Sequence, residues 1–390
     1  MRFFRSLGWI LFSLGIFTCS LFGAEREFRG VWVASVYNLD WPSAKGLPAS
    51  TQQAQLRAIL DKAADLHLNA VLLQVRPASD ALYNSRFDPW SEFLTGRAGV
   101  SPGYDPLEFA IREAHARGLE LHAWVNPFRA ALSATQQLPA NHVAKEHPEW
   151  VRRFGRQLWV DPGEPAARGY VIGVITDIVR RYDVDGIHLD DYFYPYPLHP
   201  GQATFPDDSS WQRFGAGKGP SRADWRRENI DNFVRSMYAA VKAVKPRVRV
   251  GISPFGIWRP GLPAGTTAGL DAYSQLFADS RKWLAEGWLD YLAPQLYWSI
   301  QPADQSFPVL LNWWRAQSRG KPVWPGIATE RIGTKRPASE IVRQIEITRS
   351  GTNSPGQIHW SMSALMRDQG GIDGQLKRGP YADKAQPPPR

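Results

Sequence analysis

The segment that decides the fold reads DGIHLDDYFYP and covers residues 185–195. A short apolar run leads directly into two acids and three aromatic residues, which is typical of a buried strand that ends in a functional loop. Side chains alternate between the two faces of a strand, so Ile187 and Leu189 share one face. The other face carries His188, Asp190 and Tyr192. We expect the apolar pair to pack against outer helices and the second set to face the inside of a barrel.

Apolar runs and helical patterns alternate along the rest of the chain. Further strands are predicted at 29–36, 70–75, 119–125, 248–253, 289–297, 323–328 and 357–361. Helices are predicted at 52–68, 106–117, 168–181, 224–245, 271–286, 307–319 and 339–350. These units predict an α/β fold, a single (β/α)8 TIM barrel over residues 25–370. A doubly wound open sheet is the alternative, but polar residues follow nearly every strand and no strand precedes Gly-x-Gly-x-x-Gly.

The two ends of the chain differ from this region. Two arginines precede an apolar run over residues 7–21, which predicts a cleaved export signal over residues 1–24 and a protein of the periplasm or cell envelope. The run is short for an anchor, so no stable membrane span is expected after cleavage. Cys19, the only cysteine in the sequence, is an alternative lipid-attachment site, and without it the mature chain has no thiol for catalysis. A C-terminal extension over residues 371–390 is expected to be partly disordered, because prolines cluster at its end.

Composition narrows the class of partner. The formal net charge is +9 and the charges are scattered rather than grouped, which favours loose association with an anionic envelope through a basic surface. Export argues against a nucleic-acid partner. The chain also contains 17 Trp and 13 Tyr, many of them at predicted strand ends. Flat aromatic rings with a polar tip stack on the apolar faces of sugars, so a polysaccharide is the expected partner.

Acids at the strand ends are the catalytic candidates, because a barrel of this kind builds its active site at the C-terminal ends of its strands. Cleavage of a glycosidic bond uses two carboxyl groups. Asp190 ranks first by its inward parity. Asp191 on the same rim is its first-ranked partner and Glu330 its second, although Asp191 can instead cap the loop and Glu330 can pair with a neighbouring arginine. Asp185 begins the strand, roughly 16 Å from the rim, and is expected to be structural.

Polar and aromatic residues at the same strand ends are the candidate sugar-binding residues. They are Arg76, Trp124, Asn126, His188, Tyr192, Trp258, Gln295, Tyr297, Trp298 and Trp360. No nucleophile elbow, phosphate-binding loop or His-Glu-x-x-His motif is present, and we expect no cofactor and no metal. His142 and His147 form only a weak metal-binding pair.

Several motifs together resemble the bacterial glycosyl-hydrolase-like family 10. They are FRGVWV (28–33), LLQVRP (72–77), LHAWVNP (121–127), DGIHLDDYFYP (185–195), GISPFG (251–256) and LAPQLYW (292–298). The resemblance covers about residues 25–367 and implies an exported or lipid-anchored barrel that cleaves peptidoglycan glycan strands, including strands stripped of peptide. A more distant likeness is to the hydrolase domain that cuts deacetylated poly-N-acetylglucosamine. Both likenesses point to Asp190 and Asp191.

Three functions therefore compete. The first is a glycosidase acting on an N-acetylhexosamine polymer of the envelope, with peptidoglycan glycan strands first and deacetylated poly-N-acetylglucosamine as the alternative substrate. The second is a barrel that binds glycan without cleaving it. The third is a metal-dependent polysaccharide deacetylase, which only the weak histidine pair supports.

Overall fold

A computed structural model describes residues 26–198 and 204–390 of the chain. The predicted export signal and Cys19 lie outside these residues. Eight parallel strands form the central sheet: β1 (Phe28–Val33), β2 (Ala70–Arg76), β3 (Glu120–Val125), β7 (Gly186–Leu189), β8 (Arg249–Ile252), β9 (Tyr291–Leu292), β10 (Gly326–Ala328) and β11 (Gly356–Trp360). Their order is β10-β11-β1-β2-β3-β7-β8-β9. Bridges from Leu292 to Val323 and from Gln295 to Gly326 join the two edges, which closes the barrel and confirms the predicted fold.

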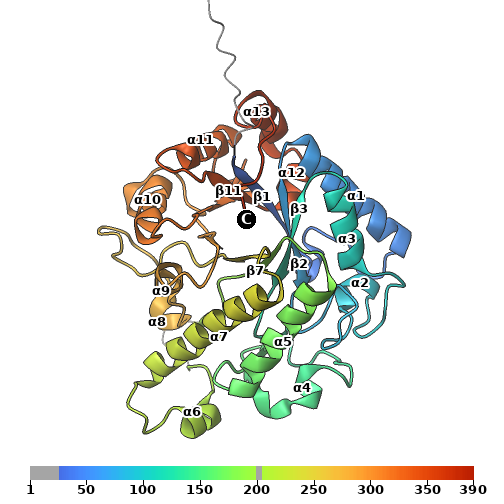
Figure 1. Ribbon diagram of the computed structural model, residues 1–390, viewed down its shortest axis with the longest axis vertical. Helices are drawn as coiled ribbons and strands as arrows, with labels where there is room; N and C mark the ends of the chain where they lie inside the picture. Colours follow the sequence, from blue (N-terminus) through green and yellow to red (C-terminus); the bar gives the residue numbers. More distant parts are fainter. Residues whose placement is uncertain (1–25, 199–203) are drawn as a thin grey trace, which may run out of the picture.

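Helices surround the sheet in Figure 1. The main covering helices are α1 (Ala49–Asp65), α3 (Pro106–His115), α5 (Pro165–Arg181), α7 (Arg222–Val244), α9 (Ser280–Ala285), α10 (Phe307–Gln317) and α11 (Ala338–Arg349). Shorter helices are α2 (Glu92–Thr95), α4 (Val143–Glu146), α6 (Asp208–Phe214), α8 (Ala272–Gln275), α12 (Met362–Met366) and α13 (Ile372–Arg378). No helix within the described residues is both long and apolar enough to cross a lipid bilayer.

Two apolar layers follow from strand alternation. Ile187 and Leu189 belong to the large core between strands and helices, as their parity predicts. A second core fills the barrel itself and is rich in aromatic rings, among them Phe28, Trp32 and Tyr291. A filled interior holds the strands rigidly, so the residues at their C-terminal ends have fixed positions.

Two excursions from the barrel build the walls above its rim. Between β3 and α5 the chain forms a small antiparallel sheet in the order β4-β6-β5, with β4 (Arg129–Ala131), β5 (Val151–Phe154) and β6 (Gln157–Val160). The second excursion is the long loop between β7 and α7. Trp159 joins the two, because its indole N–H donates to the carbonyl of Phe193 at 2.8 Å. The sequence patterns did not predict the small sheet.

Two predicted elements are shorter than expected. The helix expected over 271–286 is divided into α8 and α9, because Phe277 between them has a left-handed φ of 53° and Asp279 caps a new helix by accepting from the N–H of Lys282. The strand expected over 289–297 forms a regular ladder only at β9. Pro294 has no N–H to donate, and beyond it the pairing continues through single bridges.

The C-terminal extension also differs from the expectation of partial disorder. Its end lies across the N-terminal mouth of the barrel, and the C-terminus projects onto the middle of the ring of strands in Figure 1. Tyr381 is fully buried and shares a hydrogen bond of 2.8 Å with His359. Arg29 donates to the carbonyl of Asp383 at 2.7 Å, and Arg390 lies 3.1 Å from Glu120. These contacts give the polar groups of the extension hydrogen-bond and ion-pair partners on the barrel, and the amino-acid composition does not reveal such partners.

Candidate active site

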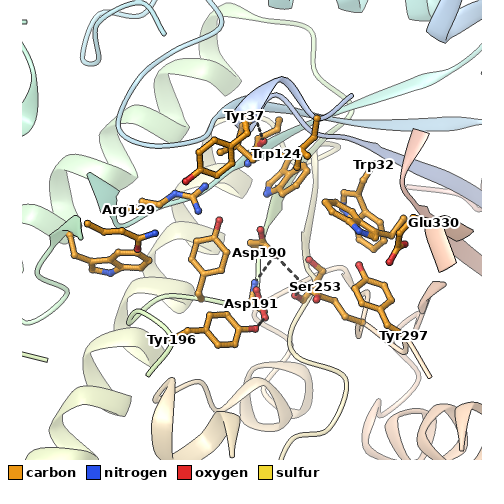
Figure 2. A pocket seen from close by; sticks show the side chains of 18 of the residues that line it. Trp32, Tyr37, Trp124, Arg129, Asp190, Asp191, Tyr196, Ser253, Tyr297 and Glu330 are labelled. Atoms are coloured by element: carbon orange, nitrogen blue, oxygen red, sulfur yellow. Dashed lines mark hydrogen bonds between the residues drawn. The ribbon is translucent and has the colours of Figure 1, made fainter. Parts of the chain in front are cut away.

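A cleft of about 770 Å³ opens at the C-terminal ends of the strands, within the walls formed by the two excursions. Figure 2 shows Asp190 and Asp191 in its middle, Trp32 and Tyr297 on one side and Arg129 on the other. Of the predicted site residues, it is lined by Trp124, Asp190, Asp191, Tyr192, Gln295, Tyr297, Glu330 and Trp360. The structure therefore brings together all three acids and most of the predicted aromatic residues in one hollow.

Asp190 is held by neutral donors. Its carboxylate accepts the side-chain amide of Asn126 at 3.1 Å and that of Gln295 at 3.2 Å. The backbone N–H of Asp191 donates to it at 3.0 Å. Burial raises the pKa of Asp190, and these hydrogen bonds oppose the rise because they stabilise the ionised form.

Asp191 is the more strongly perturbed acid. Burial and then the negative charge of Asp190 raise its pKa well above the usual range for an aspartate. The two carboxyl groups lie close enough to interact through a hydrogen bond, and the hydroxyl of Tyr196 donates to Asp191. Two carboxylates this close do not both ionise readily, so the pair favours a state that holds one proton between them.

Glu330 follows β10 and lies apart from this pair, beyond Tyr297 in the view of Figure 2. Burial raises the pKa of Glu330, while Arg331, 3.4 Å away, opposes the rise. Its Oε2 is buried and has no hydrogen-bond partner among the described residues. The predicted ion pair with Arg331 is therefore present, and the buried second oxygen of Glu330 receives no hydrogen bond from the described residues.

His188 lies below the cleft rather than beside Asp190. Its Nε2 receives the indole N–H of Trp32 at 3.1 Å, so this nitrogen is an acceptor and carries no proton. Its Nδ1 lies 3.0 Å from the hydroxyl of Tyr291. Burial, and then the nearby His122, hold the pKa of His188 well below its ordinary value, so the ring is neutral. It orients Trp32, which lines the cleft.

Asn126 supports the site from behind. Besides Asp190, its side chain donates to the hydroxyl of Tyr192 at 2.7 Å and accepts from Gln74 at 2.6 Å. Tyr192 also lies under the guanidinium of Arg129, which is 5.0 Å from the centre of its ring. Asn126 thus positions one acid and one aromatic wall at the same time.

Besides His188 and Asn126, three more of the predicted sugar-binding residues do not line the cleft. Arg76 is fully buried and forms a 2.7 Å ion pair with Asp88, because the β2–β3 ladder is irregular at this point and strict alternation ends there. Trp258 packs among outer aromatic rings, with its centre 5.3 Å from that of Tyr273. Trp298 packs edge-on against Phe255 at 5.6 Å.

Other residues of the cleft were not predicted. They include Trp32, Tyr37, Gln74, Arg129, Arg156, Trp159, Tyr196, Ser253 and Arg331. Trp32 and Gln74 lie at the ends of the first two strands, so the parity argument used for Asp190 would have identified them. Arg129, Arg156 and Trp159 belong to the small antiparallel sheet, and no pattern in the sequence signals that it folds over the rim.

The weak histidine pair has structural contacts. His142 lies 3.1 Å from the carbonyl of Ala130 and accepts the N–H of Ala144 at the start of α4. His147 stacks on Trp150 with ring centres 3.7 Å apart. Within residues 26–198 and 204–390, no three His, Cys, Asp or Glu side chains are grouped so that they could hold a metal ion.

Fold and site together define a glycoside hydrolase-like barrel with acids and aromatic rings at its rim. The model of the glycosyl hydrolase-like 10 family matches residues 27–340, and the chain belongs to this family, as the motifs predicted. It is 41% identical over 375 residues to the glycosyl hydrolase YngK of Bacillus subtilis, covering 93% of this chain and 73% of that protein. It is 36% identical over 333 residues to the glycosyl hydrolase DigH of Escherichia coli K12, covering 80% of this chain and 75% of that protein.

A solved structure shows the same fold. The glycoside hydrolase domain of PgaB (BpsB) from Bordetella bronchiseptica superposes with a TM-score of 0.59 at 14% identity, covering 90% of this chain and 98% of that one. The endo-β-1,4-mannanase of Thermotoga petrophila gives a TM-score of 0.52 at 13% identity, with coverage of 87% and 68%. At these identities the likeness concerns the fold alone.

Proposed function

We propose that the protein is a glycosidase that cleaves an N-acetylhexosamine polymer of the bacterial envelope, with peptidoglycan glycan strands as the substrate. The observation that carries the proposal is the pair of neighbouring aspartates, Asp190 and Asp191, whose pKa values are both raised at the floor of a cleft walled by aromatic rings. A carboxyl that keeps its proton near neutral pH is suited to protonate a leaving oxygen.

The geometry of the pair supports a division of roles. We assign Asp191 as the general acid, because burial and the negative charge of Asp190 both raise its pKa. Carboxyls that flank a glycosidic bond stand about 5 Å or more apart, whereas these two interact directly. Both therefore act from one side of the sugar. We assign attack on the other side to the acetamido oxygen of the substrate, with Asp190 stabilising the positive charge that develops at the anomeric centre.

The bonds balance without any further reactant except water. The acetamido oxygen bonds to the anomeric carbon, the glycosidic C–O bond breaks, and Asp191 transfers its proton to the leaving oxygen. Water then adds to the anomeric carbon as the ring formed by the acetamido group opens, and Asp191 takes up a proton from that water. Glu330→Gln tests this assignment: we expect a loss below about tenfold, whereas a loss equal to that of Asp191→Asn would make Glu330 the second catalytic carboxyl.

The charge of the cleft favours an anionic glycan. Arg129 lines the cleft with no ion pair among the described residues, and its guanidinium donates to the carbonyl of Pro77 at 2.9 and 2.8 Å. Arg156 is exposed at the tip of the β5–β6 hairpin and likewise has no ion-pair partner in the described part of the chain. Peptide-free glycan strands carry lactyl carboxylates, which these guanidinium groups can bind, while a deacetylated polyglucosamine is cationic and is repelled.

Digestion of glycan strands tests the function. The mature protein is incubated with peptide-free strands, and the products are identified by mass spectrometry. We expect shorter oligosaccharides from the wild type and a rate at least about a hundredfold lower for Asp190→Asn. Strand binding without product after long incubation would establish the non-catalytic alternative instead.

The preference for charge is tested separately with two arginines of one hairpin. Arg156 lines the cleft, whereas the exposed Arg153 does not and donates to the carbonyl of Gly155. Arg156→Gln is expected to lower kcat/KM on carboxylate-bearing strands about three- to tenfold at low salt, with Arg153→Gln close to wild type. An equal loss on strands whose lactyl groups are reduced to alcohols would contradict a role for charge.

Location in the periplasm or cell envelope remains part of the proposal. It rests on the predicted export signal and on the net positive charge of +9. Fractionation of cells that express the full-length chain is expected to recover the protein outside the cytoplasm, and a fusion lacking residues 1–24 is expected to stay inside.

A further inference from the structure

The loop that follows β1 projects two large apolar side chains over the cleft. Tyr37 is 63% exposed and Leu39 is 56% exposed, and both belong to the cleft lining. Figure 2 shows the ring of Tyr37 on the side of the cleft that also holds Arg129 and Trp124. The only aromatic contact of Tyr37 among the described residues is edge-on to Phe93 at 6.2 Å. Packing within the protein does not account for the position of this ring.

The backbone under this ring is strained. Tyr37 and Asn38 both have a φ of 54°, in the left-handed region that side chains other than glycine seldom adopt. Strain of this kind persists only where the surrounding structure enforces it, and it is found preferentially at functional sites. The side chain that this strained segment carries is largely exposed, at 63% for Tyr37.

The enforcing contacts come from the same network that positions the catalytic pair. Gln74 accepts the N–H groups of Ser35 at 3.0 Å and of Val36 at 2.9 Å through its carbonyl oxygen. Its amide donates to Asn126 at 2.6 Å, and Asn126 in turn donates to Asp190. The loop is thus tied to the floor of the cleft by two side chains.

The far side of the loop is fixed as well. The side-chain amide of Asn38 donates to the carbonyls of Pro42 at 2.9 Å and Phe93 at 3.0 Å. Asp40 accepts the N–H of Ala34 and the hydroxyl of Ser361, each at 2.8 Å. A loop held at both sides presents Tyr37 in one orientation, which lowers the entropy cost of binding a ligand against it.

We infer that Tyr37 is the stacking platform of a sugar subsite beside the catalytic pair, where it binds the apolar face of a pyranose ring of the glycan. This inference rests on the proposed function, since it assigns a subsite to the same substrate. The strained loop carries an exposed aromatic ring that the fold does not need, on the wall of a cleft that the glycan occupies. Tyr37 acts in binding and does not transfer protons.

Binding of a peptide-free octasaccharide from glycan strands tests the platform. The dissociation constant is measured by calorimetry in an Asp190→Asn background, so that no turnover interferes. Tyr37→Leu, which keeps an apolar side chain but removes the flat ring, is expected to weaken binding about five- to tenfold. Tyr37→Phe keeps the ring and is expected to stay within about twofold of its parent. Unchanged binding by Tyr37→Leu would overturn the inference.

Thermal unfolding separates a platform from a structural side chain. Tyr37→Gly removes the steric cost of the left-handed backbone, so its Tm is expected to equal or exceed that of the wild type, while octasaccharide binding is lost to the same extent as in Tyr37→Leu. A lowered Tm would indicate a packing role and contradict the inference. If the wild type binds the octasaccharide through Tyr37 but cleaves no strand, the proposed function fails and the platform stands. If the wild type cleaves strands but substitution of Tyr37 does not change binding, the platform fails and the proposed function stands.

Discussion

Both ends of the barrel carry acidic residues, but the charges that surround these residues differ between the two ends. At the N-terminal mouth Glu120 lies against His122 at 3.2 Å and Arg390 at 3.1 Å, and it is also paired with Arg249. Asp185 there accepts the N–H of Leu121 at 2.6 Å. At the rim, the charge that raises the pKa of Asp191 most is that of another acid, Asp190. The acids at the mouth are paired with cations, whereas Asp190 and Asp191 interact with each other.

Their pKa values diverge accordingly. Burial alone would raise the pKa of Glu120, but the hydrogen bond and charge of His122 together with Arg249 and Arg390 lower it to about 2. Burial and the charge of Asp190 act in the same direction on Asp191 and raise its pKa. Burial is therefore not what distinguishes a functional acid in this barrel. The sign of the charge beside it decides whether it stays ionised or holds a proton.

The largest expected effect comes from removing the proton that the rim holds. Asp191→Asn cannot protonate the leaving oxygen, so kcat on glycan strands is expected to fall by about a hundredfold to ten-thousandfold. The same change removes a carboxyl that the fold forces to stay protonated, so the variant is expected to be at least as stable as the wild type at neutral pH. Steady-state kinetics and chemical denaturation measure the two quantities.

An Asp191→Asn protein that kept wild-type kcat would contradict the comparison, because Asp191 would then contribute no more to catalysis than the acids at the mouth. A large loss of stability in Asp191→Asn would also contradict the comparison, since it would show that favourable interactions hold the Asp191 carboxylate as they hold that of Glu120.

At the mouth the expected effect is on stability. Glu120→Gln leaves Arg249 and Arg390 without their carboxylate, and loss of one partner from a buried pair costs about 3 kcal/mol of unfolding free energy. The folded variant is expected to retain wild-type kcat, because Glu120 lies at the opposite end of the strands from the cleft. Asp61→Asn is the control, since its pair with Arg117 is exposed and contributes below about 1 kcal/mol.

The smallest effect, and the one that sharpens the comparison most, is the pH dependence of stability. Asp191 has a raised pKa in the folded state, so its contribution is full at low pH and is lost as pH rises from the ordinary aspartate range through that raised value. Glu120 has a lowered pKa, so its contribution is present above the ordinary glutamate range and is lost as pH falls towards about 2.

Denaturation across a pH series therefore gives two opposite differences. Asp191→Asn is expected to gain stability relative to the wild type as pH rises, while the deficit of Glu120→Gln is expected to shrink in acid. Parallel pH curves for the two variants would mean that both acids have the same kind of surroundings.

Local sequence accounts for part of the site. Alternation along one strand separated Asp190 from Ile187 and Leu189, which pack in the outer core. The distance of Asp185 from the rim predicted a structural role for that residue, and its hydrogen bond with the N–H of Leu121 agrees with this role. The same reasoning failed for Arg76, because the ladder between β2 and β3 is irregular where that residue lies. Alternation predicts which way a side chain points only while the ladder is regular.

Other residues depend on contacts between distant segments. Arg129 and Trp159 reach the cleft because the small antiparallel sheet folds back over the rim, and Trp159 is fixed by the carbonyl of Phe193. Tyr196 reaches Asp191 from within the loop after β7. No periodic pattern in the sequence encodes these approaches.

The amino-acid sequence by itself determined the barrel, the family and the strand that carries Asp190 and Asp191 to the rim, because periodicity of side chains and short motifs are local properties of the chain. Only the tertiary structure decided that burial and the charge of Asp190 raise the pKa of Asp191, that Arg76 forms an internal ion pair with Asp88, and that Tyr37 stands over the cleft on a strained loop. Burial, charge and strain depend on groups that the fold brings together from distant parts of the sequence, and the properties they govern are therefore absent from any one segment.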